Sequence, residues 1–579
     1  MSAARMDPMA VCDLDALGVR ETLRGRSVLV TGVTGFVAKV WLAFLLDRAP
    51  DIGRVVVLAR GKRGQSAASR VQRIIERSPC FRPLRAAHGD RLGAFLDDKL
   101  EVVEGDARRP MLGIDERLLA GLLPRLDAVV HVAGLTDFEP DPRDAVAVNV
   151  RGATHAADLA ARTAGRRLVH VSTCYVAGQG SREVAEQLDV GRSPNGTRFD
   201  PEGELLAIES VCASIDERLD RDDPPAARRE RIATGTKRAR ALGWPNLYTY
   251  TKALSEHLLA QREDGPAITV VRPSIVECAR EFPFPGWNEG MNTSGPLIWL
   301  IGTLHRRMPF QAKNHFDVVP VDSVARGMTL ALVDALRDES FDPMRPVRAI
   351  WQLASSGTNP LTIGRALDLS TLARRREYAK SDDPFERFVL GNLDSVLAER
   401  SAEEDAWLPT ARKATRALRD ALVAFDPEHH LPRGLRERFG DALSKKARKT
   451  AKTLGNASRT IGQVEQMLRV YQPFVWDDDV VFRTDRASEQ NALLGEDERA
   501  LFGFDVRSID WRRYWLEVQI PGLDKWSLPL LRGERAPEDP PCPLDRAVRE
   551  LRGEDRSDEQ GRGIERAPAM AIAMGEEAE

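Results

Sequence analysis

The chain has 579 residues, of which 42% are hydrophobic and 30% are charged, and its formal net charge is −3 at pH 7. This length exceeds the size at which a single hydrophobic core stops growing, so we expect more than one domain. The composition is that of a globular protein, and the near-neutral charge argues against a nucleic-acid footprint spread over the whole chain.

Six cysteines are scattered along the chain without a C-x-x-C pair, which disfavours a zinc site and a disulfide framework. We therefore expect no metal and a reducing, cytoplasmic location. The first 26 residues contain acidic side chains and no continuous apolar core, so they do not resemble a secretory signal. The run that comes nearest to a membrane span, PLIWLIGTL at 296–304, has half of the ~18 residues required, which leaves only peripheral membrane association open.

From Ser27 to Arg60 the chain alternates between short apolar runs, a glycine turn and an apolar helical stretch (SVLV, TGVTGF, VAKVWLAFLLDRA, RVVVLAR). This pattern predicts a β-α-β unit with two buried parallel strands. Further strands are predicted within 100–106, 126–134, 167–176 and 268–276, with helix-compatible segments between them. The alternation predicts an α/β fold, a Rossmann-like doubly wound parallel sheet.

Four regions are expected along the chain. Residues 1–24 form an N-terminal helical extension, and 25–370 form the Rossmann domain with substrate-binding elements and an insertion at 179–242. Residues 371–530 are polar and mainly helical, with a basic cluster at 445–452 that is either a solvated helix face or a contact for a phosphate-bearing carrier or an anionic membrane. The charged, Pro/Gly-rich tail at 531–579 is expected to be disordered.

The turn TGVTGF follows a buried strand and opens a helix. Glycines at this point let the backbone approach a pyrophosphate, and the helix N-terminus presents unpaired N–H groups and partial positive charge. The third small residue of the pattern is Ala38, which still permits close packing of the helix on the strand. We assign the loop to dinucleotide binding through Thr31, Gly32, Thr34, Gly35 and Phe36.

The next strand ends at Arg60, followed two residues later by Lys62, where an NAD-selective site would place an acid on the ribose 2′-hydroxyl. Basic side chains there can hold a 2′-phosphate, so we predict NADPH as the cofactor. Asp106, at the end of LEVVEGD, is placed like an acid that contacts the adenine side. Ala133 and Gly134 close another strand beside the expected cofactor groove.

A tyrosine and a lysine stand four residues apart in GWPNLYTYTKALSE (243–256), on one face of a predicted helix. The phenol of Tyr248 is protonated at neutral pH, and the ammonium of Lys252 would stabilise the phenolate left after proton donation. Such a pair suits the reduction of a carbonyl by hydride. By itself the spacing also arises by chance on solvated helices, so the assignment depends on the rest of the chain.

Ser172 and Thr173 end a predicted strand, at the edge where open α/β sheets bind ligands. A hydroxyl there can hydrogen-bond a substrate carbonyl oxygen beside Tyr248, and we favour Thr173. The adjacent Cys174 raises an alternative, a thiolate nucleophile forming an acyl-enzyme, but no activating base is near it in sequence and we expect a packed cysteine.

Three further residues are assigned to cofactor binding. Asn149, in AVNVRGAT, would support the site through its amide, with helix capping or a surface role as equal alternatives. Pro273 and Ser274 belong to the predicted strand at 268–276. His131 is expected to be packed in its strand, and the arginine run that includes Arg231 is ambiguous.

The first ~330 residues resemble the extended short-chain dehydrogenase/reductase superfamily. Several stretches are more specifically similar to fatty acyl-CoA reductases, and LFGFDVRSIDWRRYW resembles the C-terminal male-sterility segment of that family. The stretches similar to the reductase part are TGVTGFVAKVWLAFLL, VLARGKRG, VVHVAGLTDF, VHVSTCYV, GWPNLYTYTKALSE, VVRPSIVECA with FPFPGWNEGMN, and FDVVPVDSV. Departures from the family are Ala38, Asn288-Glu289 and the absence of a C-terminal membrane span.

The resemblance implies NADPH-dependent reduction of a long-chain acyl thioester, acyl-CoA or acyl-ACP, to a primary alcohol through an aldehyde. It implies that Tyr248 donates the proton, that Lys252 binds the nicotinamide ribose and tunes Tyr248, and that Thr173 or Ser172 orients the carbonyl. An apolar tunnel for the acyl chain is expected within 285–304. Two alternatives stay open, a two-electron reductase that releases aldehyde and a non-catalytic cofactor-binding protein, and the oligomeric state is not predicted.

Overall fold

The computed structural model describes residues 17–62, 64–220, 223–290, 310–339, 345–388, 402–424 and 479–531, with shorter stretches between them and up to residue 551. The chain divides into two compact units. The first contains residues 1–295, 317–361 and 480–579, and the second contains 296–316 and 362–479. Residues 480–551 therefore group with the first unit, although the sequence suggested a separate region from 371 to 530.

The first unit is built on a parallel sheet with the strand order β11-β7-β5-β4-β1-β2-β3-β14. Its strands are β1 (Val28–Thr31), β2 (Val55–Ala59), β3 (Leu100–Glu104), β4 (Ala128–His131), β5 (Arg167–Val171), β7 (Ala267–Pro273), β11 (Val347–Leu353) and β14 (Glu550–Leu551). Val28 of β1 is in register with Val55 on one side and Ala128 on the other. The strand order therefore reverses between β1 and β4, the topological switch point where such sheets bind ligands.

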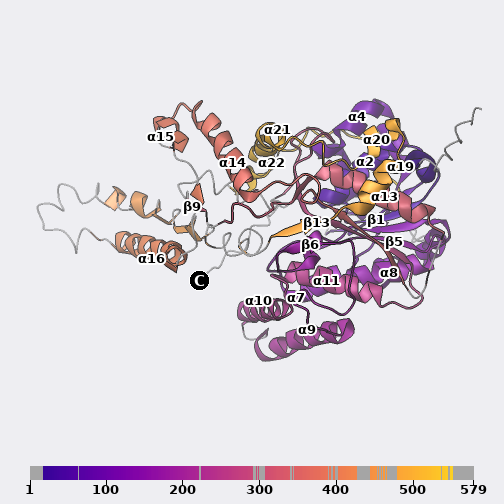
Figure 1. The fold of residues 1–579 in the computed structure, drawn as a ribbon, viewed down its shortest axis with the longest axis horizontal. Helices are drawn as coiled ribbons and strands as arrows, with labels where there is room; N and C mark the ends of the chain where they lie inside the picture. Colours follow the sequence, from indigo (N-terminus) through magenta and orange to yellow (C-terminus); the bar gives the residue numbers. More distant parts are fainter. Residues whose placement is uncertain are drawn as a thin grey trace, which may run out of the picture. The chain divides into compact units, whose positions relative to one another are not determined.

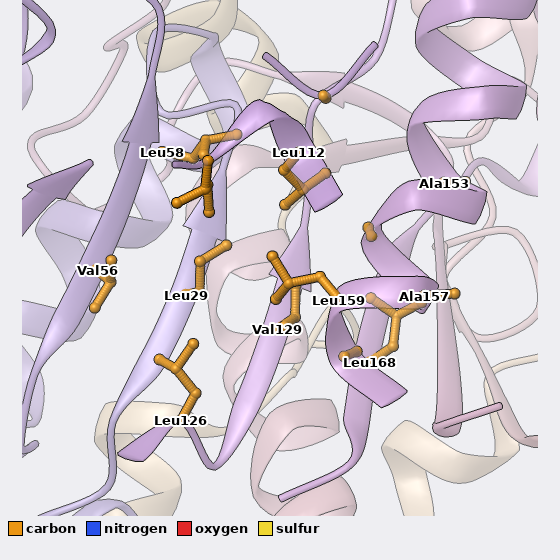
Figure 2. Close-up of a cluster of buried hydrophobic side chains, with 14 of the residues drawn as sticks. Leu29, Val56, Leu58, Leu112, Leu126, Val129, Ala153, Ala157, Leu159 and Leu168 are labelled. Atoms are coloured by element: carbon orange, nitrogen blue, oxygen red, sulfur yellow. The ribbon is translucent and has the colours of Figure 1, made fainter. Parts of the chain in front are cut away.

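The central strands are apolar because both faces of the sheet are covered. Every residue of β1, β2 and β4 is buried. Figure 2 shows part of this core, where Leu29 and Val129 of the strands lie near Ala153 and Ala157 of a covering helix. The small alanines one turn apart let that helix approach the sheet closely. The doubly wound parallel sheet predicted from the sequence is confirmed.

Helices cover the two faces of the sheet in separate layers (Figure 1). On one face α2 (Phe36–Arg48) packs on α13 (Val321–Arg337), and the indole of Trp41 donates to Thr329 Oγ1 at 3.1 Å. On the other face lie α8 (Gly152–Arg162) and α11 (Leu247–Ala260). The helix predicted to carry the Tyr/Lys pair is thus present, and Asn246 caps it by accepting a 2.9 Å hydrogen bond from Thr249 N.

The insertion at 179–242 is mostly helical and packs on α11. Its strand β6 (Arg182–Val184) pairs with β13 (Val480–Phe482) of the returning C-terminal segment. Its helices are α9 (Pro201–Ile215), the π-helical turn η7 (Asp216–Asp220) and α10 (Pro224–Ala241). Leu205 and Ile208 of α9 share an apolar cluster with Tyr250 and Leu254 of α11, so the insertion buries the outer side of the Tyr/Lys helix.

Part of the tail predicted to be disordered is packed on the first unit. The Asp539 carboxylate accepts from Arg82 Nε at 2.9 Å and also pairs with Arg85, and β14 adds to the sheet beside β3. Disorder was predicted from a charged, proline-rich composition, and the specific ion pairs outweigh that tendency in the described residues 537–544 and 548–551. Residues 552–579 lie outside the described residues.

The remaining elements of the first unit are short and connect or flank the sheet. Those before the Tyr/Lys helix are α1 (Val19–Leu23), α3 (Ala67–Arg77), η1 (Pro79–Phe81), α4 (Arg82–His88), η2 (Gly89–Arg91), α5 (Leu92–Lys99), η3 (Pro110–Gly113), α6 (Glu116–Leu122), η4 (Leu123–Arg125), α7 (Pro142–Ala145), η5 (Val146–Arg151) and η6 (Cys174–Ala177). Those after it are β8 (Ile275–Glu277), β10 (Val318–Pro320), α19 (Asp485–Leu493), α20 (Glu496–Phe502), α21 (Trp511–Arg513), η10 (Tyr514–Gln519), α22 (Ile520–Trp526) and α23 (Leu528–Leu531).

The second unit contains α14 (Ile363–Tyr378), α15 (Pro384–Phe388), η8 (Leu390–Asn392), α16 (Ala402–Val423) and a parallel pair formed by β9 (Arg307–Met308) and β12 (Val396–Leu397). The basic residues Lys445, Lys446, Arg448, Lys449 and Lys452 are helical and exposed. None of the helices in the described part of the chain is long and apolar enough to cross a membrane.

Candidate active site

The structure brings most of the predicted site residues to the carboxyl edge of the sheet. They follow β1 (the glycine loop), β2 (Arg60, Lys62), β3 (Asp106), β4 (Ala133, Gly134), β5 (Ser172, Thr173) and β7 (Pro273 as its last residue, then Ser274). The carboxyl ends of parallel strands meet at one edge, so strands far apart in sequence place these groups together.

The glycine loop lies against the end of β4. Gly32 has φ = +82°, and a Cβ at this position would lie 2.7 Å from Ala133 N. The Thr31 hydroxyl oxygen accepts from Ala133 N at 3.1 Å and from Val132 N at 3.2 Å, which joins the two strand ends. Gly35 then caps α2 and is exposed, so the first N–H groups of this helix are available to an anion.

Basic side chains follow β2, as predicted. Arg60 and Lys62 are exposed, and Arg60 Nη1 lies 3.9 Å from Asp106 Oδ2 at the end of the neighbouring strand. Arg108 holds the same carboxylate with Nε at 3.0 Å, and hydrogen bonding from Arg108 lowers the pKa of Asp106. Asp106 therefore carries a negative charge at the carboxyl edge of the sheet, with Arg60 beside it.

Asn149 is buried and hydrogen-bonds two separate segments of the chain, so it is neither a helix cap nor a surface residue. Its Oδ1 accepts from Leu135 N at 2.7 Å, and its Nδ2 donates to Leu135 O and to Thr251 Oγ1, both at 3.0 Å. The amide therefore ties the segment after β4 to the start of α11. Its hydrogen-bonding capacity is largely used by protein groups, so we find no direct reason to place it on the cofactor.

Lys252 projects from α11 toward the end of β5. Its side chain is buried, and Nζ donates a 2.7 Å hydrogen bond to the Val171 carbonyl oxygen. A Cβ added to Gly134 would lie 3.7 Å from Nζ, which places the ammonium beside the end of β4. Burial lowers the pKa of Lys252 to about 8. The lysine is thus poised to change charge near neutral pH.

Tyr248 is partly accessible and lies beside Thr173. Withdrawal from water raises the pKa of Tyr248 to about 12, although a hydrogen bond with Thr173 opposes that shift. The phenol is therefore protonated throughout the physiological range and can donate its proton. Thr173 Oγ1 also lies 3.4 Å from Pro273 O and 3.3 Å from Tyr175 N, which fixes the hydroxyl between β5 and β7.

Two further hydroxyls of this edge lack a protein partner. Within the described residues, Ser172 Oγ and Ser274 Oγ are buried and form no hydrogen bond. Buried polar groups are nearly always paired in native proteins, so these two are candidates to bind a ligand. The turn at Gly32 carries no side chain, and the first N–H groups of α2 have no side-chain cap. Together with the two hydroxyls, these features fit a dinucleotide that lies along the carboxyl edge.

Cys174 and His131 are packed groups, as expected. Cys174 is fully buried, its Sγ donates to the Arg272 carbonyl oxygen at 2.9 Å, and burial raises the pKa of the thiol well above its usual value. A thiolate nucleophile is therefore disfavoured. Burial lowers the pKa of His131 to about 3, and its Nδ1 lies 3.0 Å from Thr31 Oγ1.

Sequence reasoning missed an ion pair between Lys39 and Glu289. Lys39 lies on α2 with only 5% of its side chain exposed, and its Nζ donates to Glu289 Oε2 at 2.7 Å. A single charge within the apolar helix FVAKVWLAFLL was the available signal, because a buried lysine requires a partner. The pair ties the loop around residue 288 to the helix that follows the glycine turn.

The expected acyl tunnel falls largely on undescribed residues. Met291, Leu297, Trp299 and Leu300 lie outside the described residues. Trp287 is described and packs on Trp526 with ring centroids 4.8 Å apart. The returning segment therefore covers the loop that follows β8.

The fold and this edge define an oxidoreductase of the Rossmann type that uses a nicotinamide cofactor. A model of an NAD-binding family described as male sterility protein matches residues 30–328. The chain belongs to this family.

Curated relatives match over most of their length. Probable fatty acyl-CoA reductase 4 of Arabidopsis thaliana is 28% identical over 518 residues, covering 86% of this chain and 97% of the relative. Probable fatty acyl-CoA reductase 5 of the same plant is 26% identical, covering 86% and 97%. The alcohol-forming fatty acyl-CoA reductase of Simmondsia chinensis is 25% identical, covering 87% and 98%. Among solved structures, the terminal R domain of the myxalamid PKS-NRPS pathway is 17% identical with a TM-score of 0.49, covering 90% of this chain and 95% of that one.

Proposed function

We propose that this protein reduces long-chain fatty acyl-CoA to a primary alcohol through an aldehyde, with NADPH as the reductant. The observation that carries the proposal is the match to fatty acyl-CoA reductases over nearly their whole length, in a chain that also holds Thr173, Tyr248 and Lys252 at one edge. Each thioester consumes two NADPH and two protons and yields one alcohol, one CoA and two NADP⁺.

NADPH supplies the hydride in each step. The hydroxyls of Thr173 and Tyr248 are hydrogen-bonded to each other, so they lie close enough for one carbonyl oxygen to replace that bond and accept from both. These donors stabilise the negative charge that develops on the oxygen in the transition state more than they stabilise the neutral carbonyl. Collapse of the resulting hemithioacetal releases CoA and leaves the aldehyde.

The reduction of the aldehyde requires a proton for the new alkoxide. Tyr248 donates it, since its phenol is protonated at neutral pH. The Lys252 ammonium, held by Val171 O, stabilises the tyrosinate that remains. Ser172 and Ser274 are assigned to hydrogen bonds with the cofactor or substrate, because their buried hydroxyls have no protein partner among the described residues.

The selectivity for NADPH is assigned to Arg60 and Lys62. Both side chains are exposed at the end of β2, where the ribose of a bound dinucleotide carries its 2′ substituent. Two cations there favour a 2′-phosphate over a 2′-hydroxyl.

The test is a stoichiometry measurement on the purified full-length protein. Hexadecanoyl-CoA and NADPH are incubated with enzyme, NADPH oxidation is followed by absorbance, and the products are identified by mass spectrometry. We expect two NADPH oxidised for each CoA released, with hexadecanol as the product. A ratio of one with hexadecanal instead indicates the two-electron reaction, and no oxidation with any acyl-CoA contradicts the proposal. Tyr248→Phe serves as the catalytically impaired control.

A further inference from the structure

A short segment after β4 is fixed at both of its ends. This segment, residues 135–141, is called the strap below. At its start, Leu135 N donates to Asn149 Oδ1 at 2.7 Å and Leu135 O accepts from Asn149 Nδ2 at 3.0 Å. Both backbone groups of Leu135 are therefore held by one buried side chain, so the direction in which the strap leaves the sheet is set.

The end of the strap is held by a buried charge from the insertion. Arg231 of α10 is 2% exposed, and its guanidinium donates to Asp141 Oδ2 at 2.8 Å from Nη2 and at 3.0 Å from Nε. A third nitrogen, Nη1, pairs with Asp216 of η7. Burial alone would raise the pKa of Asp141, but the hydrogen bonds from Arg231 and Arg143 outweigh it and lower the pKa. Arg231 is the buried member of the arginine run at 228–231, in which Arg228 and Arg229 are exposed.

Between these anchors the strap presents one aromatic ring to the catalytic tyrosine. The ring of Phe138 lies 6.1 Å from the ring of Tyr248, between centroids, at an interplanar angle of 40°. Thr136 and Asp137 are exposed, whereas Phe138 is half-buried. An aromatic side chain that keeps part of its surface exposed and lies against Tyr248 can supply apolar surface to a substrate.

We propose that Phe138 is a specificity-determining residue that forms the apolar wall for the acyl carbons next to the reacting carbonyl, and that Arg231 is a positioning residue that acts through the strap. This inference rests on the proposed function. A carbonyl oxygen within hydrogen-bonding distance of Tyr248 places the first methylenes of the acyl chain within reach of groups that contact the tyrosine ring. The two anchors remove freedom from the strap before substrate binds, so less entropy is lost on binding.

The first experiment measures how substitution of Phe138 changes the kinetics with acyl-CoA and the affinity for NADPH. Phe138→Ala and Phe138→Leu are compared with wild type for kcat and KM with long-chain acyl-CoA, and the Kd of NADPH is measured by fluorescence. We expect Phe138→Ala to raise the KM for acyl-CoA about 10-fold, the loss of roughly two methylene contacts, while Phe138→Leu stays within about threefold. The Kd of NADPH should not change. Phe388→Ala, which truncates a phenylalanine that is 67% exposed on α15, is the matched control.

The outcomes separate this inference from the proposed function. If the wild-type protein reduces acyl-CoA and Phe138→Ala has the same KM as wild type, the role of Phe138 is wrong but the proposed function stands. Wild type that reduces no acyl thioester overturns the proposed function and this inference with it. A raised Kd for NADPH in Phe138→Ala places the ring at the cofactor and also contradicts the inference.

The second experiment is a double-mutant cycle on the positioning residue. Arg231→Lys keeps the buried charge but loses the bidentate geometry. It is expected to lower the Tm and, in the folded protein, to raise the KM for acyl-CoA about threefold. In the Phe138→Ala background, the same substitution should leave the KM unchanged, because the ring it positions is gone. Should Arg231→Lys unfold the protein, Asp141→Asn is used in the same cycle. An unchanged KM in the single variant, or effects that multiply in the double variant, would overturn the positioning role.

Discussion

The ammonium of Lys252 donates a 2.7 Å hydrogen bond to the backbone carbonyl oxygen of Val171, the last residue of β5. The lysine thereby joins the helix that carries Tyr248 to the strand that leads to Ser172 and Thr173. Because the group is buried, its charge is costly, and its pKa lies at about 8 instead of near its ordinary value of 10.5.

We expect the rate of aldehyde reduction to depend on pH through Lys252. Below pH ~8 the Lys252 ammonium is charged and stabilises the tyrosinate. Above pH ~8 this stabilisation is lost, so kcat/KM should fall. Tyr248 does not cause the fall, because its pKa is about 12 and it keeps its proton over this range. A pH profile of kcat/KM for a fatty aldehyde checks this. Lys252→Arg stays charged and should abolish the inflection; a wild-type profile flat to pH ~10 contradicts the assignment.

The same pKa predicts how stability changes with pH. The folded protein loses the Lys252 proton near pH 8, while the unfolded chain keeps it until about 10.5. Over that window the unfolded state binds more protons, so the Lys252 contribution to the free energy of unfolding rises with pH. Chemical denaturation of wild type and Lys252→Met at several pH values isolates this contribution, which should be absent in the variant. Parallel pH dependence in the two proteins would show that another group is responsible.

Removal of one hydroxyl should separate catalysis from cofactor binding. Tyr248→Phe keeps the ring packed on Phe138 but cannot donate a proton, and we expect kcat for aldehyde reduction to fall about 10²–10⁴-fold. The Kd of NADPH, measured by fluorescence, should change less than about threefold. Retention of near wild-type kcat would exclude Tyr248 as the proton donor.

The turn after β1 requires glycine for two reasons, and a matched pair of variants separates them. Gly32 and Gly25 both have positive φ, +82° and +71°, so alanine strains the backbone at either site. A Cβ at Gly32 also meets Ala133 N at 2.7 Å, while nothing lies within 4 Å of one at Gly25. Both alanine variants should lose about 1 kcal/mol of stability, and Gly32→Ala should lose more and also bind NADPH at least ~10-fold more weakly. Equal cofactor affinity in the two variants contradicts a role of the turn in binding.

The choice of cofactor is predicted to depend on Arg60. Its guanidinium is exposed beside Asp106, so truncation should alter phosphate binding with little effect on the fold. Arg60→Ala should raise the KM for NADPH about 10-fold and leave the KM for NADH unchanged. The control is Arg26→Ala, which removes an arginine paired with Asp127 just before β1 and should preserve the cofactor preference. An Arg60→Ala enzyme with the wild-type preference refutes the assignment.

The buried lysine of α2 predicts an asymmetric effect of charge removal. Glu289→Gln leaves the Lys39 ammonium buried without its carboxylate and should lower the free energy of unfolding by about 1–2 kcal/mol, discounted because a third of the Glu289 side chain is exposed. Lys39→Met combined with Glu289→Gln removes both charges and should recover part of the loss. Glu517→Gln, which breaks an exposed pair with Arg513, should have no measurable effect in the same urea titration. A Glu289→Gln variant as stable as wild type would show that water reaches Lys39.

The sequence alone determined the sheet and the residue types of its carboxyl edge. The runs at Val28–Thr31 and Val55–Ala59 are apolar throughout because both of their faces are covered, and such runs separated by a glycine turn and a helix have few other solutions. Tyr248 and Lys252 are four residues apart, and the period of the α-helix alone puts them on the same face. Local sequence patterns were sufficient to predict those features that are caused by neighbouring residues, such as the type of an element and the face on which a side chain lies.

Tertiary structure decided what partners those residues have. The predicted alternatives for Asn149 could not be separated from sequence, because the backbone of Leu135 and the hydroxyl of Thr251 meet its amide only after folding. The same holds for Arg231, which looked like one member of a charged run and is the buried anchor of Asp141. A sequence period reports which side of a helix is apolar. Burial, pKa and pairing depend instead on groups from other elements, such as Asp141 and Arg231, which are 90 residues apart and are brought together by the fold.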